Sequence, residues 1–318
     1  MARCLVTGGA GFIGSHLATN LVGDGWDVVV LDDLSTGKRN NLAHLGNSFT
    51  LIEGSILDDA ALEKAIAGAE VVFHHAAMVS VPRSVEDPLL CHELCATGTL
   101  KVLRAAVRAG VRRVVYAASS SAYGGEVVCP IDENQPILAL SPYAAGKLAG
   151  EHYCSAFAAT TSLETVRLRY FNIFGARQDP SSPYSGVISI FCTKMLRGER
   201  PTIHGDGLQS RDFVPVANVV RANRLAAEKP GVSGKVFNIG CGGRINLLEL
   251  VDAINRKLGT RLEPIFAPPR AGDVRDSQAD IAAAQTLLGY EPFTPFETGL
   301  AECLDYYRLL TGTQDRST

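Results

Sequence analysis

The sequence predicts an α/β protein: a doubly wound parallel sheet with a smaller, mixed α/β substrate-binding lobe. Short Val/Ile/Leu-rich runs alternate with amphipathic stretches of helical length through the first half of the chain, a pattern typical of strand–helix–strand crossovers. A glycine-rich turn directly follows the first of these runs. After about residue 175, Pro- and Gly-rich punctuation separates shorter elements, which predicts the second lobe. At roughly 150 residues per domain, the 318 residues allow about two lobes.

The first half of the chain supplies the predicted sheet. Its apolar runs are continuous rather than alternating, as expected for strands that helices cover on both faces. We expect strands at residues 3–7, 27–32, 49–53, 71–75, 113–117 and 165–169. We expect the intervening helices at residues 15–23, 60–66, 96–109 and 143–157. Residues 236–240 read as another strand that returns to this sheet. The predicted domains are residues 1–174 with returning segments near 213–240, and a discontinuous lobe within residues 175–318.

The composition is that of a globular protein, with 46% hydrophobic and 20% charged residues. A net charge of −3 without a basic stripe predicts that neither nucleic acid nor an anionic membrane surface is a main partner. No apolar run approaches the roughly 18 residues of a transmembrane helix, and the first residues lack the features of a signal peptide. We therefore expect a cytoplasmic protein.

The eight cysteines are interpreted as reduced thiols, because no secretory signal is recognisable. Cys91, His92 and Cys95 are close enough in sequence to suggest metal ligands. However, no matching pair follows downstream, and the segment has helical spacing. We interpret these three residues as packing residues and predict no metal site.

The glycine-rich turn has the spacing of a dinucleotide-binding turn, which makes the predicted sheet Rossmann-type. Within residues 7–14, Gly8 allows the tight turn, Gly11 lets the backbone approach a pyrophosphate, and Gly14 permits close helix packing. The second predicted strand ends at Asp32, where a carboxylate accepts hydrogen bonds from ribose hydroxyls. Because an acid repels a 2′-phosphate, the predicted cofactor is NAD rather than NADP.

Tyr143 and Lys147 are four residues apart behind Pro142, so one face of a helix carries both. Positive charge from Lys147 and from an oxidised nicotinamide favours the phenolate of a tyrosine whose unperturbed pKa is about 10. Three serines, residues 119–121, end a predicted strand, where a hydroxyl can hold a reacting oxygen. These features predict a catalytic set of Tyr143, Lys147 and a serine of residues 119–121.

Over essentially its whole length the chain resembles the extended short-chain dehydrogenase/reductase superfamily, and within it the NAD-dependent epimerase/dehydratase family. It is most similar to the UDP-glucose and UDP-N-acetylglucosamine 4-epimerases. Besides the motifs above, the resemblance rests on His74-His75-Ala76-Ala77, Arg169-Tyr170-Phe171-Asn172, Arg211-Asp212-Phe213 and Arg270-Ala271-Gly272-Asp273.

The resemblance implies a mechanism. Tyr143 as a phenolate would take the proton from the sugar O4 while hydride passes from C4 to NAD+. Ser119 would bond O4, with Ser120 as the alternative if the register is off by one, and Lys147 would bond the nicotinamide ribose. The 4-keto intermediate would turn over in the site and be reduced on its other face, which inverts C4 without net redox change.

The resemblance also assigns binding residues. Expected at the cofactor are Gly8, Gly11, Phe12, Ile13, Gly14, Asp32, Leu34, Ser35, Thr36, Gly37, Ser55, Ile56, His75, Ala76, Ala77, Tyr143, Lys147 and Tyr170. Expected at a UDP-sugar substrate are Val79, Ser80, Ser119, Ser120, Asn172, Gly186, Val187, Thr202, His204, Arg211, Arg270, Asp273 and Ser277.

Several substrate residues have implied roles. Arg211 and Arg270 would clamp the diphosphate, because guanidinium groups bind phosphates bidentately. Asp273 would bond the uridine ribose, and Asn172 a phosphate or sugar oxygen. His204 stands where many relatives stack a tyrosine on uracil. A large aromatic residue closes the sugar pocket of glucose-restricted epimerases at the position of Ser277.

A small Ser277 would leave room for a 2-acetamido group. The resemblance therefore predicts interconversion of UDP-N-acetylglucosamine and UDP-N-acetylgalactosamine as well as of UDP-glucose and UDP-galactose. By analogy, helices around residues 89–109 and 143–159 would pair across a two-fold axis into a four-helix bundle, which predicts a homodimer.

Three positions depart from the family pattern. Cys95 replaces an asparagine beneath the nicotinamide, and Asn218 replaces an aspartate that follows the Arg211-Asp212-Phe213 motif. Ser55 replaces the aspartate that would bond the adenine amine, which should weaken cofactor binding by about 1 kcal/mol.

Other functions remain open on the sequence alone. A UDP-glucuronate 4-epimerase would use the same three catalytic residues, and so would a dehydrogenase that releases NADH. An intact Ser119, Tyr143 and Lys147 disfavours a non-catalytic NAD-dependent regulator. Ser120 and Ser121 stand where 4,6-dehydratases carry an Asp-Glu pair and where glucuronate decarboxylases carry a glutamate at the second position, which disfavours both reactions.

Overall fold

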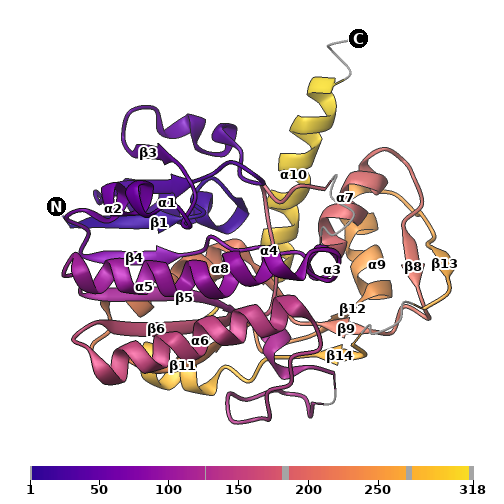
Figure 1. Ribbon diagram of the computed structural model, residues 1–318. Helices are drawn as coiled ribbons and strands as arrows, with labels where there is room; N and C mark the ends of the chain where they lie inside the picture. Colours follow the sequence, from indigo (N-terminus) through magenta and orange to yellow (C-terminus); the bar gives the residue numbers. More distant parts are fainter. Residues whose placement is uncertain (1, 126, 181–185, 270–273, 315–318) are drawn as a thin grey trace.

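The computed structural model describes residues 2–125, 127–180, 186–269 and 274–314 (Figure 1). A seven-stranded sheet in the order β11-β6-β5-β4-β1-β2-β3 forms the larger lobe, and all its neighbouring strands are parallel. Its strands are β1 (Arg3–Thr7), β2 (Asp27–Asp32), β3 (Thr50–Glu53), β4 (Val71–His74), β5 (Arg113–Ser119), β6 (Glu164–Tyr170) and β11 (Val236–Ile239).

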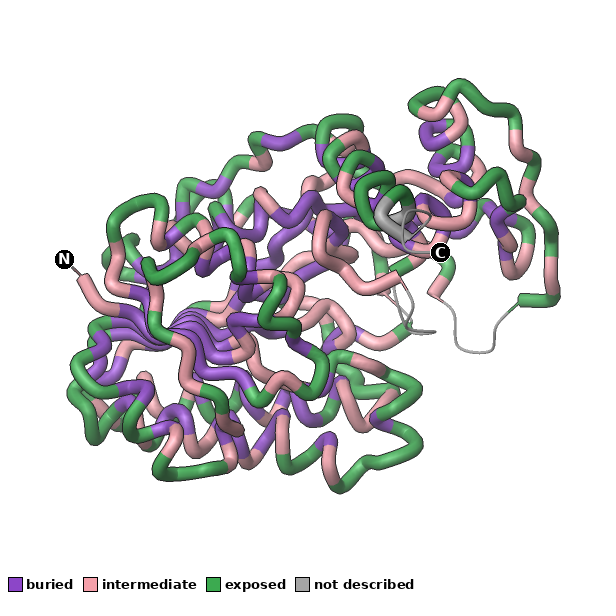
Figure 2. The backbone as a smooth tube through the Cα atoms, turned by 90° about the horizontal axis from the view of Figure 1, so that it is seen from above, coloured by how far each residue is buried: buried purple, intermediate pink, exposed green. Residues whose placement is uncertain are grey.

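Helices cover both faces of this sheet. One face packs against α2 (Asp59–Ile66), α5 (Gly98–Arg108) and α6 (Pro142–Thr160), and the other against α1 (Phe12–Gly23), α8 (Val216–Glu228) and η4 (Ala284–Leu288). The central strands are the most buried part of the chain (Figure 2). The predicted doubly wound α/β fold is therefore confirmed.

The predicted elements differ from the observed ones mainly at their ends. The expected helix at residues 96–109 is preceded by a π-helical turn, η2 (Glu93–Thr97), and by the short helices α3 (Val81–Glu86) and α4 (Pro88–His92). β5 continues to Ser119, because Ala118 and Ser119 still pair with β6. Short helices also follow β2, at η1 (Arg39–Leu45), and β5, at η3 (Ser120–Tyr123).

The smaller lobe has its own hydrophobic core between α7 (Val187–Leu196), α9 (Leu247–Leu258) and α10 (Phe296–Gln314). Short strand pairs and a three-stranded sheet surround it: β7 (Asn172–Phe174) with β10 (Phe213–Pro215), β8 (Thr202–His204) with β13 (Ile265–Ala267), and β9 (Ser210–Arg211) between β12 (Ile245–Asn246) and β14 (Asp276–Ser277). β11 lies beside β6, so the chain does return to the large sheet after visiting the smaller lobe.

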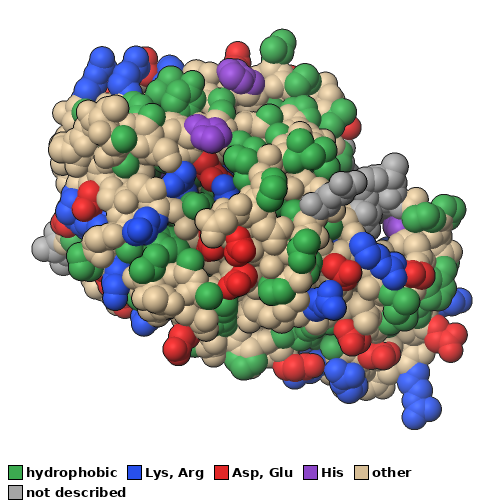
Figure 3. Space-filling model, turned by 90° about the horizontal axis from the view of Figure 1, so that it is seen from below, with side chains coloured by type: hydrophobic (Ala, Val, Ile, Leu, Met, Phe, Trp, Pro, Cys, Tyr) green, Lys and Arg blue, Asp and Glu red, His purple; other side chains and the backbone are tan. Residues whose placement is uncertain are grey.

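Acidic and basic side chains are intermingled on the face of the molecule that Figure 3 displays. No helix in the described part of the chain is long and apolar enough to cross a membrane. Cys91 and Cys95 are buried and pack against Met78 and Tyr143, as predicted, but His92 is exposed, so the packing interpretation was wrong for this residue.

Asn218 is fully buried and serves the fold. Its carboxamide oxygen accepts the backbone N–H groups of Phe293 and Thr294 at 3.1 and 2.9 Å, and its amide group donates to the carbonyl of Thr294 at 2.9 Å. A carboxylate can accept these two bonds but cannot donate the third. The departure from the family's aspartate thus gives α8 a contact that ties it to the segment before α10.

We predict that Asn218→Asp lowers the free energy of unfolding by about 1–3 kcal/mol, because a buried charge then faces the Thr294 carbonyl without a donor between them. Denaturant titration measures the effect. Asn246→Asp is the matched control, since Asn246 caps α9 by accepting the Glu249 N–H, and aspartate caps equally well. Equal stability of the two variants would contradict this account of Asn218.

Candidate active site

The glycine turn joins the ends of β1 and β4 by direct backbone contact. Gly8 has a φ of +68°, and a Cβ atom there would lie 2.7 Å from the Ala76 nitrogen. A Cβ at Gly14 would lie 2.2 Å from the Gly8 carbonyl oxygen. No side chain caps the start of α1 at Gly11, so the first N–H groups of this helix stay available to an anion.

Asp32, at the end of β2, holds the loop around this turn. Its carboxylate accepts the Ala10 N–H at 2.8 Å and the Leu34 N–H at 2.9 Å. Burial raises the pKa of Asp32, and these two backbone donors oppose the rise. A Cβ at Gly37 would lie 2.6 Å from the same carboxylate, so residues 34–37 wrap around it. The expected cofactor residues of this loop are thus gathered at one carboxylate.

The other expected cofactor residues differ in their surroundings. Ser55 accepts the Leu57 N–H at 3.2 Å, and Ile56 is buried. The His75 ring stacks on Tyr170 with 6.1 Å between ring centroids, and both of its ring nitrogens are buried without a hydrogen-bond partner in the described residues. Burial lowers the pKa of His75 to about 3, so the imidazole is neutral.

These features fit a bound dinucleotide. Gly8 and Gly14 leave space beside the start of α1, which no side chain caps, and the carboxylate of Asp32 ends the second strand. The buried imidazole of His75 has no hydrogen-bond partner among the described residues. Which of the predicted residues touch the cofactor stays a prediction.

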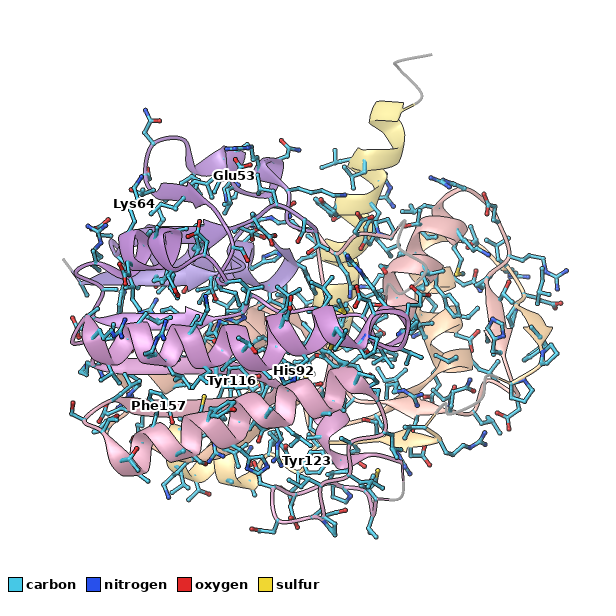
Figure 4. The ribbon with its side chains drawn as sticks, viewed as in Figure 1. Glu53, Lys64, His92, Tyr116, Tyr123 and Phe157 are labelled. Carbon is cyan, nitrogen blue, oxygen red and sulfur yellow. The ribbon has the colours of Figure 1, made fainter. Side chains whose placement is uncertain are left out.

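The structure brings Ser119, Tyr143 and Lys147 together. Ser119 ends β5, and Tyr143 lies in the first turn of α6, which Ser141 caps by accepting the Ala144 N–H at 3.1 Å. Lys147 follows one turn later, 4% exposed, with its ammonium 4.8 Å from the ring centre of Tyr116 (labelled in Figure 4). Ser120 begins η3, beside Ser119.

Burial dominates the electrostatics of this set. It raises the pKa of Tyr143 to about 12, although a hydrogen bond with the Ser119 side chain opposes the rise. Burial also lowers the pKa of Lys147. The opposing effect comes from Ser119, and the expected depression of the tyrosine pKa by Lys147 stays a prediction. A cationic nicotinamide beside the ring would favour the phenolate.

A cavity of about 510 Å³ lies in the smaller lobe, and Ser119, Tyr143 and Lys147 are not among its described lining residues. Asn172, two residues beyond the end of β6, links the two, since Tyr170 pairs with Ser119 across the sheet. Six predicted substrate residues line the cavity: Asn172, Gly186, Val187, Thr202, His204 and Arg211. The described lining contains no carboxylate, which suits an anionic ligand.

The remaining predicted substrate residues lie elsewhere. Val79 is 70% exposed, and Ser80 caps α3 by accepting the Arg83 N–H. Ser277 belongs to β14, where it pairs with Arg211 and accepts the Asp212 N–H on its carbonyl. Arg270 and Asp273 lie outside the described residues.

Sequence reasoning missed other polar residues of this region. Lys194 and Gln209 line the cavity. Lys194 could have been found from the sequence, because it is a cation on the mostly apolar helix α7. Gln209 donates to the His204 carbonyl at 2.6 Å. Asp212 accepts the N–H groups of Cys241, Gly242 and Ala279, while burial raises its pKa to about 6. The buried pair Glu151–Arg169 was missed as well.

We predict that Gly14→Ala abolishes cofactor retention, because the new methyl group collides with the Gly8 carbonyl and opens the turn. Absorbance of nucleotide released by acid gives the bound fraction per chain. Gly23→Ala, in the last turn of the same helix, is the control, since its added Cβ would meet no atom within 4 Å. Full occupancy in Gly14→Ala would contradict the placement of the nucleotide at this turn.

Comparison with known proteins agrees with this geometry. The sequence model of the NAD dependent epimerase/dehydratase family matches residues 4–240. The UDP-glucose 4-epimerase of Mycolicibacterium smegmatis is 41% identical over 311 residues, which cover 96% of this chain and 98% of that protein. The crystal structure of a Thermotoga maritima UDP-glucose 4-epimerase with UDP-glucose matches with a TM-score of 0.92 and 40% identity, over 97% of this chain and 99% of that one.

A Methanobrevibacter ruminantium UDP-N-acetylglucosamine 4-epimerase in complex with UDP-N-acetylmuramic acid matches with a TM-score of 0.93 and 37% identity. This match covers 97% of the present chain and 99% of the other. The family model spans most of the chain, and the relatives match almost end to end. The chain therefore belongs to the NAD-dependent epimerase/dehydratase family.

Proposed function

We propose that this protein is an NAD-dependent UDP-sugar 4-epimerase that interconverts UDP-N-acetylglucosamine with UDP-N-acetylgalactosamine, and UDP-glucose with UDP-galactose. The observation that carries the proposal is the set of Ser119, Tyr143 and the buried Lys147, in which the side chains of Ser119 and Tyr143 share a hydrogen bond, together with the glycine turn and a cavity whose described lining has no carboxylate. The names of the relatives support the reaction class. They include epimerases of both plain and acetylated sugars.

The chain's residues divide the work of this reaction. NAD, when bound, would supply reversible two-electron redox chemistry. Tyr143 takes the proton of the reacting hydroxyl and gives it back, while the Ser119 hydroxyl holds that oxygen in line. Lys147 holds the nicotinamide ribose. Lys147 is buried and the phenol of Tyr143 is desolvated, which limits the access of water to the intermediate.

The sugar preference is the finer part of the proposal. Ser277 lies beside Arg211 in the β9–β14 pair, next to the residues of the cavity. A small side chain at this position leaves space for a 2-acetamido group. A UDP-glucuronate 4-epimerase is the alternative, and it requires a cationic partner for the C6 carboxylate.

Nuclear magnetic resonance of the purified protein with each UDP-sugar, without added cofactor, tests the function. We expect C4-inverted anomeric signals from UDP-N-acetylglucosamine and UDP-glucose and none from UDP-glucuronate. Turnover of UDP-glucuronate alone would favour the alternative. The absence of C4-inverted anomeric signals with all three UDP-sugars would contradict the proposed reaction.

We predict that Tyr143→Phe lowers kcat by about 10²–10⁴-fold with little change in UDP affinity, because the proton acceptor is lost and the ring is kept. Tyr153→Phe is the control, since Tyr153 is a half-exposed tyrosine of the same helix. Burial raises the pKa of Tyr143 in the cofactor-free chain, so the phenol is protonated there at neutral pH. A wild-type kcat in Tyr143→Phe would argue against Tyr143 as the base.

We predict that Ser277→Tyr lowers kcat/KM for UDP-N-acetylglucosamine by about tenfold or more, because the tyrosine ring would fill the space that the 2-acetamido group needs. The value for UDP-glucose should stay within about threefold. Steady-state kinetics with the two substrates provide the measurement and the internal control. Equal losses of kcat/KM with both substrates would contradict the placement of Ser277 in the sugar pocket.

We also propose a homodimer through the faces of α5 and α6. Exposed apolar side chains of these segments include Val107 of α5 at 39%, Tyr153 of α6 at 38% and Leu89 of the preceding helix α4 at 78%. Apolar side chains clustered on neighbouring helices favour a partner surface. A monomeric mass by light scattering at micromolar concentration would contradict the dimer.

A further inference from the structure

A buried ion pair lies one helical turn beyond the catalytic lysine. Glu151 on α6 is 2% exposed and Arg169 on β6 is 5% exposed. Arg169 Nε donates to Oε1 and Oε2 of Glu151 at 3.0 and 3.2 Å, and Nη2 donates to Oε2 at 2.9 Å. Both oxygens of the carboxylate are thus bound by one guanidinium group.

Glu151 is also the natural ion-pair partner of Lys147. The two residues are four apart on one helix, a spacing at which a lysine and a glutamate normally attract each other. Among the described residues, however, the Lys147 ammonium makes no hydrogen bond or ion pair. It lies over the Tyr116 ring instead, and the Tyr116 hydroxyl donates to the Lys147 carbonyl at 3.1 Å.

Arg169 is held in place from its other side. Its guanidinium group lies 4.8 Å from the ring centre of Tyr123, a residue of η3 that is labelled in Figure 4. The Tyr123 hydroxyl in turn donates to the Asn238 carboxamide of β11 at 2.6 Å. One nitrogen of Arg169, Nη1, is buried without a partner in the described residues. One nitrogen of Arg169 therefore makes no hydrogen bond among the described residues, while both carboxylate oxygens of Glu151 accept hydrogen bonds.

We propose that Arg169 is a positioning residue for the catalytic helix: it binds the Glu151 carboxylate, and so leaves the Lys147 ammonium free for the nucleotide and the tyrosine. The inference rests on the proposed function. Without Arg169, the carboxylate would have one cation within reach on its own helix, Lys147. The pair thus prevents a contact that would tie up the lysine.

Three variants test this role. Arg169→Met frees the carboxylate, and we expect kcat to fall by about tenfold or more because Lys147 is captured. The double variant Glu151→Gln/Arg169→Met removes the carboxylate charge as well, and we expect kcat to return to within about threefold of wild type. Arg113→Met is the control, because the buried Arg113 pairs with the half-buried Glu164 at the opposite end of the same strands.

Thermal unfolding is recorded for every variant, and rates are compared below the lowest midpoint. Arg113→Met should lower the midpoint without changing kcat. A merely structural role for Arg169 predicts that the double variant is as slow as Arg169→Met, and that result would overturn the proposal, as would a wild-type kcat in Arg169→Met. If Arg169→Met does not fold, Arg169→Gln replaces it with the same expectations.

Bound NAD provides a readout that does not depend on turnover. We expect Arg169→Met to retain less NAD than wild type and the double variant to regain it, because Lys147 holds the nicotinamide ribose. Unchanged NAD in Arg169→Met would overturn the proposal even if the wild type epimerised none of the UDP-sugars. Inactivity of the wild type with normal NAD behaviour of the variants would instead count against the proposed function alone.

Discussion

The contact between Gly8 and the backbone of Ala76 lies where the sheet reverses its strand order, between β1 and β4. Parallel strands place all their carboxyl ends at one edge, and a reversal of order opens a crevice there. Because neither residue 8 nor residue 14 has a Cβ atom, the turn, the helix start and the end of β4 close onto one another. Asp32, His75 and Ser119 all extend from this edge, so their mutual placement depends on that close approach.

The same edge is unusually dry for a set of ionisable groups. Burial moves the pKa of His75 and of Lys147 downward and the pKa of Tyr143 upward, and in each case the neutral form is favoured. A site of this kind responds strongly to any charge brought into it, since little water screens the interaction. The chemistry of the tyrosine is thereby coupled to the presence of a cationic ligand ring.

The fold was predictable because its signals are local. Each buried strand is a short apolar run, and even β11, which follows part of the smaller lobe, shows this signature in Val236–Ile239. Ser119, Tyr143 and Lys147 were identifiable from helix spacing and chain order together with family resemblance. Long-range polar contacts carry no such signal: the pairing of Glu151 with Arg169, and the contacts of Asn218 with Phe293 and Thr294, exist only after the elements have packed. The raised pKa of Tyr143 was not predicted either, because the spacing of residues along the sequence does not show how far a side chain is desolvated.

The position of β11 has a consequence for the growing chain. β6 carries Arg169 and Tyr170, and its outer edge is covered only by residues 236–239. During synthesis, β6 is therefore an open edge strand until about 70 further residues have left the ribosome, and an unpaired edge is a template for wrong association. This interval contains α7 and β8 of the smaller lobe and α8 of the larger one, whereas α9 and α10 follow β11. The large sheet is therefore completed before the smaller lobe has two of its three core helices, so the elements of the two lobes emerge interleaved.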